Sequence, residues 1–119
     1  MVKLIIAGGR DFKDYSKLVA VSDHMLSKLV KTRDIEIVSG GARGADALAI
    51  DYANMRGYSL TIMNADWDTH GKSAGYKRNA EMAEYSTHLI AFWDGQSRGT
   101  KHMIDLANKL KLKVHVVPY

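Results

Sequence analysis

The chain has 119 residues, of which 46% are hydrophobic and 25% charged, with a formal net charge of +4. This length predicts a single domain, residues 1–119, with enough apolar material for a packed core. The absence of cysteine excludes disulfides, thiolate metal sites and thiol nucleophiles, and it is typical of a protein from a reducing cytoplasm.

The first two predicted elements are a strand and a helix. Residues 2–7 are almost continuously apolar, as in a parallel strand covered on both faces. This run is much shorter than the core of a signal peptide, and we expect a cytoplasmic protein. A helix is predicted from Ser16, because apolar residues recur at intervals of three and four, the spacing of one helix face: Leu18, Val21, Met25 and Leu29.

The rest of the chain continues this alternation. Strands are predicted at residues 35–38, 58–63, 87–92 and 114–117, and helices at 45–56, 75–84 and 100–110. Residues 64–74 form a long connection, and no segment approaches the length needed to span a bilayer. We therefore predict an α/β fold, a Rossmann-like three-layer sandwich whose five-stranded parallel sheet has the order 3-2-1-4-5.

This strand order brings together the loops at residues 8–11, 39–46 and 93–100. Each loop contains glycine and one arginine: Arg10, Arg43 or Arg98. Glycine-rich turns before helices present backbone N–H groups to anions, and arginine binds phosphate oxygens in pairs. A tight strand-to-helix turn without a ligand is the alternative for the loop at 39–46. The predicted ligand-binding residues are Gly8, Gly9, Arg10, Ser39, Gly40, Gly41, Ala42, Arg43, Gly44, Asp46, Trp67, Lys72, Arg78, Asn79, Trp93, Asp94, Gly95, Ser97, Gly99 and Thr100.

Several of these residues have two possible roles. Ser97 and Thr100 can donate to a ligand or cap a helix, and Asp46 can stabilise a helix amino end. Asp11 and Asp94 can accept ribose hydroxyls or hold a magnesium ion. Trp67 and Trp93 can stack on a base or pack in the core.

Some chemistries are disfavoured by missing patterns. The histidines show no paired spacing, which argues against a histidine metal site. The glycine loop lacks the lysine and hydroxyl ending of a P-loop, which argues against hydrolysis of ATP or GTP, and neither GxGxxG nor a nucleophile elbow occurs.

Four motifs in order resemble the YspA branch of the SLOG superfamily. They are Gly8-Gly9-Arg10-Asp11-Phe12; residues 39–46; Trp67 with residues 71–75 and Arg78-Asn79; and residues 91–100. The superfamily includes the "lonely guy" phosphoribohydrolases, DNA-processing protein A, and sensor domains of bacterial and phage conflict systems. The resemblance implies a Rossmann-like fold, a nucleotide site at the glycine loops and often a homodimer.

The chain departs from the phosphoribohydrolases at one important position. Arg78 matches their arginine on the third helix, but the position of their glutamate is occupied by Met103. The loop before Gly99 is also about two residues longer than theirs. Weak catalytic candidates are Arg78, Asp11 and Asp94, while Glu81 and Glu84 fit an exposed helical face better.

These departures favour binding over catalysis. We expect a protein that binds a nucleotide or nucleotide-derived ligand, as a sensor or sequestering protein in bacterial or phage conflict. The alternatives are hydrolysis of an N-glycosidic bond in a nucleotide and, third, binding of single-stranded DNA. No cofactor is expected to be required, although magnesium could enter with a nucleotide. A homodimer or higher homo-oligomer is expected, and a membrane partner is not.

Overall fold

The computed structural model describes residues 1–29 and 34–119. Within these residues, five strands form one parallel sheet in the order β3-β2-β1-β4-β5. The strands are β1 (Val2–Gly8), β2 (Ile35–Ser39), β3 (Ser59–Ile62), β4 (His88–Trp93) and β5 (Lys113–Pro118). The predicted α/β architecture and strand order are confirmed.

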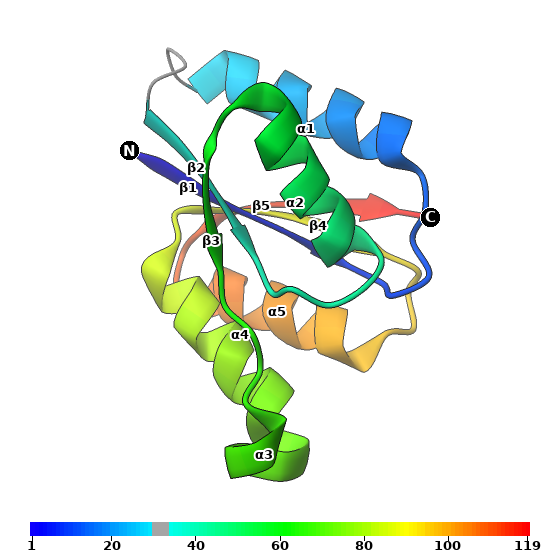
Figure 1. Cartoon of the computed structure of the whole chain (residues 1–119), viewed down its shortest axis with the longest axis vertical. Coiled ribbons are helices and arrows are strands. Elements are labelled where there is room, and N and C mark those ends of the chain that lie inside the picture. Colours follow the sequence, from blue (N-terminus) through cyan, green and yellow to red (C-terminus); the bar gives the residue numbers. More distant parts are fainter. Residues whose placement is uncertain (30–33) are drawn as a thin grey trace.

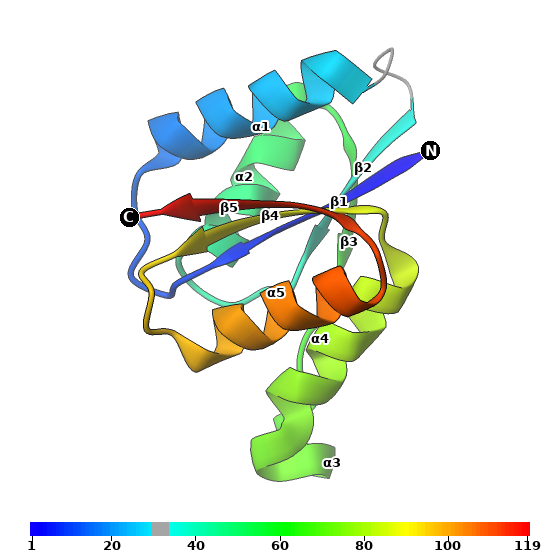
Figure 2. The ribbon, with the colours of Figure 1, turned by 180° about the vertical axis from the view of Figure 1, so that it is seen from behind.

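Helices cover both faces of the sheet. On one face lie α1 (Tyr15–Leu29) and α2 (Ala45–Arg56), and on the other lie α4 (Ala74–Tyr85) and α5 (Arg98–Lys109) (Figures 1 and 2). The central strand β1 contributes to both cores: Leu4 and Ile6 face α1 and α2, whereas Ile5 and Ala7 face α4 and α5. Burial on both sides explains its continuous apolar sequence.

The long connection at residues 64–74 contains two short helices that the sequence analysis missed. They are α3 (Trp67–His70) and the 3₁₀ turn η2 (Gly71–Ser73), which lie at one end of the molecule below the sheet (Figure 1). Asp66 starts α3, because its carboxylate accepts a hydrogen bond from the Thr69 N–H at 3.1 Å. The short helices carry Trp67 and Lys72 out from the sheet beside the first turn of α4.

Helix α1 buries only part of the apolar stripe that its sequence shows. Its buried residues are Leu18, Ser22 and Leu26, one i, i+4 row, whereas Leu29 is 41% exposed. The small side chain of Ser22 allows the helix to approach the sheet along this row. Val21 and Met25 are partly buried against the same core, and only Leu29 of the stripe is exposed.

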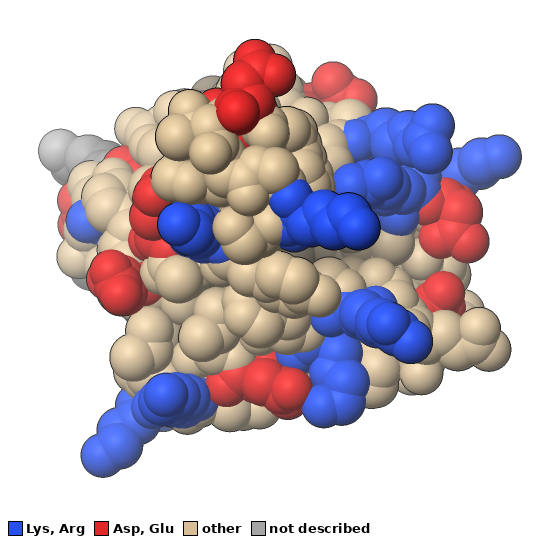
Figure 3. Space-filling model, turned by 90° about the horizontal axis from the view of Figure 1, so that it is seen from below, with Lys and Arg blue, Asp and Glu red and all other residues tan. Residues whose placement is uncertain are grey.

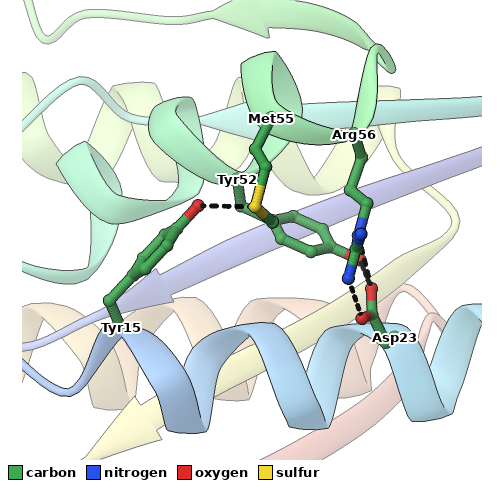
Figure 4. Close-up of polar contacts among 5 residues, drawn as sticks. All are labelled: Tyr15, Asp23, Tyr52, Met55 and Arg56. Carbon is green, nitrogen blue, oxygen red and sulfur yellow. Dashed lines mark hydrogen bonds and ion pairs between the residues drawn. The ribbon is translucent and has the colours of Figure 1, made fainter.

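Helices α1 and α2 are joined by a polar cluster on the same face (Figure 4). The Asp23 carboxylate accepts a hydrogen bond from the Tyr52 hydroxyl at 2.6 Å and two from the Arg56 guanidinium. Burial alone would raise the pKa of Asp23, but these hydrogen bonds outweigh it and lower the pKa. No helix among the described residues is long and apolar enough to cross a membrane.

Candidate functional site

A cleft of about 500 Å³ opens at the carboxyl edge of the sheet, where β1 and β4 lie side by side. Ligands of open parallel sheets bind at this kind of position, where the strand order reverses. Its walls come from the β1–α1, β2–α2 and β4–α5 loops and from α3, η2 and α4. The predicted residues that line it are Gly8, Gly9, Arg10, Ala42, Asp46, Trp67, Lys72, Arg78, Asn79, Asp94, Ser97, Gly99 and Thr100.

The β1–α1 loop forms the wall nearest the sheet. The Gly9 carbonyl accepts hydrogen bonds from the Phe12 and Ala45 N–H groups, which ties this loop to the start of α2. Asp11 also lines the cleft, and its Oδ1 accepts a hydrogen bond from the Tyr119 hydroxyl at 2.5 Å. Burial and this hydrogen bond raise the pKa of Tyr119. Asp11 is thereby held in one orientation and keeps Oδ2 for other contacts.

The glycine loop at residues 39–46 uses two of its backbone N–H groups in hydrogen bonds of its own. The Gly41 N–H donates to Ser39 Oγ, and the Ala42 N–H donates to Asp46 Oδ2. Gly44 has a φ of 79°, and a Cβ there would lie 2.6 Å from the Arg10 Cα. The loop therefore serves close packing against the β1–α1 loop, and it offers a ligand fewer N–H groups than its sequence suggests.

Asp46 is a nearly buried carboxyl group in the wall of the cleft. Burial raises its pKa to about 6, against the opposing effects of Arg78, of the Ala42 N–H and of Arg10. This environment goes beyond the helix-end role considered from the sequence. The group changes charge near neutral pH, beside the cations of the cleft.

Arg78 crosses from α4 to the glycine loop. Its Nη1 donates to the Gly40 carbonyl at 2.6 Å, and its Nε donates to Asn79 Oδ1 at 3.1 Å. Among the described residues, Nη2 has no hydrogen-bond partner. The guanidinium is therefore fixed in place with one nitrogen left for a ligand.

The β4–α5 loop forms the opposite wall. Asp94 Oδ1 accepts hydrogen bonds from the Gln96 and Ser97 N–H groups, both at 2.8 Å, and these bonds lower the pKa of Asp94. Ser97 caps α5, because its Oγ accepts a hydrogen bond from the Thr100 N–H. Within the described chain no acceptor meets the Gly99 N–H, which leaves a donor at the positive end of α5.

Two exposed aromatic rings stand at the mouth of the cleft. Trp67 of α3 is 52% exposed, and Tyr76 of α4 is 48% exposed. The Tyr76 ring meets His102 of α5 edge to face, with 4.5 Å between ring centroids. These rings have an apolar face available beside cationic and backbone donors.

The charges around this end of the molecule are mixed. Arg10, Lys72 and Arg78 line the cleft together with Asp11, Asp46 and Asp94. In the view from below, lysine and arginine side chains also alternate with aspartate and glutamate rather than forming one continuous cationic surface (Figure 3). The cleft is thus suited to a ligand that has both anionic groups and hydrogen-bond donors.

Comparison with known proteins identifies the family. Residues 2–70 match the family described as YspA, cpYpsA-related SLOG. The chain belongs to this SLOG family. The gene 61 protein of Mycobacterium phage D29 is 36% identical over 121 residues, which cover 96% of this chain and 94% of that protein.

A solved structure supports the same fold for this SLOG chain. DNA processing protein A from Helicobacter pylori, which binds single-stranded DNA, is similar with a TM-score of 0.72 at 21% identity. The match covers 99% of this chain and 66% of that one. Similarity at this level of identity shows the Rossmann-like arrangement.

Some residues predicted for the site of the SLOG chain lie outside the cleft lining. Arg43 is exposed on the glycine loop. Trp93 is half-buried and packs on the α4–α5 side, and its Nε1 donates a hydrogen bond to the Ser97 carbonyl. The others outside the lining are Ser39, Gly40, Gly41, Gly44 and Gly95. Their contact with a ligand stays a prediction.

Other lining residues were missed by the sequence analysis. They are Ala7, Gly75, Tyr76, Met82 and Met103. Gly75, Asn79 and Met82 recur at helical spacing, so the α4 face could have been found by extending from Arg78-Asn79. Met103, at the position of the phosphoribohydrolase glutamate, is 2% exposed and provides apolar floor.

Within residues 1–29 and 34–119, no three His, Cys, Asp or Glu side chains gather in a way that could hold a metal ion.

Proposed function

We propose that this SLOG protein binds a nucleotide or nucleotide-derived ligand in the cleft without hydrolysing it. The observation that carries the proposal is the convergence of a fixed arginine, a helix amino end and an exposed tryptophan on one cleft at the carboxyl edge of the sheet.

The phosphate group lies between α4 and α5 in this proposal. Arg78 offers Nη2, the Gly99 N–H extends from the start of α5, and Lys72 and Arg10 add charge from the rim. A charge-assisted hydrogen bond from an oriented guanidinium is among the strongest that a protein makes to phosphate. Arg78 is therefore the main phosphate contact.

The nucleoside part extends toward Trp67. The exposed indole ring can stack on a base, a contact that contributes about 1–3 kcal/mol. Asp11 and Asp94 each have one carboxylate oxygen held by the protein and the other left for a ribose hydroxyl. A magnesium ion, where present, enters with the phosphates of the ligand and is held partly by these carboxylates.

Binding without hydrolysis follows from the floor of the cleft. Met103 offers neither a proton nor a negative charge where the phosphoribohydrolases carry a glutamate. A sensor or sequestering protein in bacterial or phage conflict, acting as a homodimer or higher oligomer in the cytoplasm, fits this site, and the similarity to a phage protein supports that setting.

Thermal unfolding with a nucleotide panel tests the proposal. A ligand that binds only the folded state raises the melting temperature, and we expect such a rise with nucleoside mono- or diphosphates or ADP-ribose. Lys72→Ala should reduce the rise and Arg78→Ala should abolish it. Lys109→Ala removes one positive charge at an exposed position outside the cleft and should preserve the rise, while Arg43→Ala tests whether the predicted loop arginine contacts the ligand.

Lys72→Ala keeps this test informative if Arg78→Ala destabilises the glycine loop, because Lys72 is exposed. Failure of the whole panel to raise the melting temperature would contradict nucleotide binding. Loss of the rise in Arg43→Ala, with Arg78→Ala unaffected, would place the ligand on the outer side of the glycine loop.

Hydrolysis of an N-glycosidic bond is a second candidate, favoured by the nearly buried Asp46 carboxyl beside Arg78. A carboxyl with a raised pKa can act as a general acid. Incubation with nucleoside monophosphates should release no free base. Release of free base by the wild type that is lost in Asp46→Asn, or in Asp11→Asn or Asp94→Asn, would favour the interpretation that the protein is a hydrolase.

Single-stranded DNA binding is the third candidate. The solved structure of Helicobacter pylori DNA processing protein A concerns such binding, and Trp67 and Tyr76 give this chain two rings at the mouth of the cleft. Successive bases can stack on rings placed in this way. A single nucleotide and single-stranded DNA differ in how affinity depends on the length of the ligand and on the salt concentration.

A further inference from the structure

A second hollow lies at the opposite edge of the sheet from the cleft. This α1 groove, of about 710 Å³, runs between α1 and the amino-terminal ends of β4 and β5. Val21, Met25 and Leu29 line its helical wall, and His88 and His115 line its floor. Nothing in the proposed nucleotide binding uses these residues.

The helical wall is an apolar stripe of α1 that the core covers only in part. Leu18, Ser22 and Leu26 make the contact with the sheet, whereas Val21, Met25 and Leu29 remain partly or largely exposed. Their spacing of four is that of a helix face made to pack against something. Leu29 at the end of this stripe is 41% exposed and Val21 and Met25 are only partly covered by the core, so the stripe keeps apolar surface that the described part of the chain does not bury.

The floor shows the same lack of cover. Lys113, His115 and Val117 of β5 face the α1 side of the sheet, and only Val117 is buried. Parallel strands are normally covered on both faces. On its other face β5 lies beside α5, whereas on the α1 side Lys113 and His115 at its start are exposed.

The charges of the groove have one sign. Lys28 and Lys113 lie at its rim, and its lining contains no aspartate or glutamate among the described residues. The acidic residue of the middle of α1, Asp23, points instead to Tyr52 and Arg56 of α2 (Figure 4). An occupant that combines apolar and acidic side chains would match both the wall and the rim.

We propose that the α1 groove is a docking site for an acidic amphipathic helix of a partner protein. The wall spans residues 20–29, about 15 Å of helix, which corresponds to roughly three turns of an occupant lying alongside α1. Such a helix would complete the α1–α2 layer over β5. A second copy of this chain is a poorer occupant, because the chain carries a net charge of +4.

A designed peptide can test this proposal with the full chain. The probe is a fluorescein-labelled helix of about 18 residues with a leucine stripe flanked by glutamates, and its matched control has lysine at every glutamate position. By fluorescence anisotropy, the acidic peptide should bind saturably with one peptide per chain. The lysine peptide should bind at least tenfold more weakly.

Charge reversal in the protein provides the decisive comparison. The double variant Lys28→Glu, Lys113→Glu should weaken the acidic peptide at least tenfold and strengthen the lysine peptide. Lys13→Glu with Lys109→Glu changes the net charge equally at exposed positions outside the groove and should change neither affinity by more than about twofold. All four positions are exposed or at a rim, so both variants should fold, as circular dichroism would show.

Three results would overturn the proposal. The first is no saturable binding of the acidic peptide, or equal binding of both peptides. The second is an unchanged affinity for the acidic peptide in the double variant Lys28→Glu, Lys113→Glu, or a loss of that affinity in Lys72→Ala. The latter would show that the peptide binds in the cleft. The third is a wild-type dimer that the groove variant converts to a monomer, which would make a second copy the occupant.

Discussion

At the scale of single residues, Asp46 links the stability of the fold to pH. Burial raises the pKa of this carboxyl from 3.8 to about 6 despite the opposing effect of Arg78. Unfolding returns the group to its ordinary pKa, so the folded state binds the proton more tightly. The stability that this proton provides is complete below pH 3.8 and is lost as the pH rises to about 6.

We therefore expect Asp46→Asn to remove this pH dependence. Between about pH 4 and pH 7.5, the free energy of unfolding of the wild type should fall by about 1–3 kcal/mol relative to that of the variant. Urea unfolding at several pH values measures the difference. Asp94→Asn is the control of opposite sign, because hydrogen bonds lower the pKa of Asp94 and its stabilisation is lost as the pH falls. Parallel curves for wild type and Asp46→Asn would contradict the assignment.

Residue roles in the site were harder to predict than residue types. The sequence placed Arg43 and Arg78 equally in the site, but only Arg78 lines the cleft. A loop arginine has many directions open to it, whereas a residue on a helix face is fixed by the helix and its contact with the sheet. Trp93 shows the same limit, since a tryptophan beside a strand end can turn into the core.

At the scale of elements, the turn before α2 holds two walls of the cleft together. Gly44 combines a φ of 79° with close contact to the backbone of Gly9 and Arg10. Gly57, at the end of the same helix, has a φ of 71° but no atom within 4 Å of an added Cβ. Gly44 also has a ψ of −131°, a conformation that only glycine adopts readily, whereas Gly57 has a ψ of 25° in the left-handed helical region. An alanine at Gly44 therefore meets greater backbone strain as well as close packing.

We expect Gly57→Ala to lower the free energy of unfolding by about 1–2 kcal/mol, the cost of a left-handed alanine. Gly44→Ala should cost more, about 3 kcal/mol or above, because its Cβ would also push the β1–α1 loop away from α2. Urea unfolding of both variants compares them directly. Equal losses would show that the loops separate without cost and that close packing does not hold this wall.

The elements themselves were predictable to a large degree. Strands such as β1 and β4 are short apolar runs between helical patterns, and right-handed crossovers restrict the order in which they can pair. The short helix α3 was missed because four residues are too few to show a helical period, although Asp66 is a favoured residue at a helix amino end. The predicted stripe of α1 is covered in part, because Leu18 is buried and Val21 and Met25 pack against the core while Leu29 is exposed. Periodicity marks an apolar stripe without saying how much of it is covered.

At the scale of the whole molecule, the excess of positive charge attracts anions in general, and the residues of the cleft determine which anions bind. The 17 lysines and arginines exceed the 13 acidic residues by four. Around the cleft, however, Asp11 and Asp94 stand beside the cations. A nucleic acid strand leaving the cleft would pass these carboxylates, whereas a single nucleotide can use them for its ribose.

Affinity should therefore depend little on the length of the ligand. We expect deoxyadenosine oligonucleotides of one, four, eight and sixteen residues to compete for the cleft with affinities within about threefold of one another after correction for the number of sites. Between 50 and 200 mM salt, affinity should fall by about tenfold or less, as for one or two neutralised phosphates. Single-stranded DNA binding would instead give an affinity that rises steeply with the length of the oligonucleotide and a salt dependence that steepens with it, because each added phosphate contact releases further counterions.

The variants Trp67→Ala and Tyr76→Ala identify the ring on which a base stacks, since both side chains are exposed. A loss of affinity confined to Trp67→Ala fits one base in the cleft. Equal losses of affinity in both variants fit a strand that lies across the two rings.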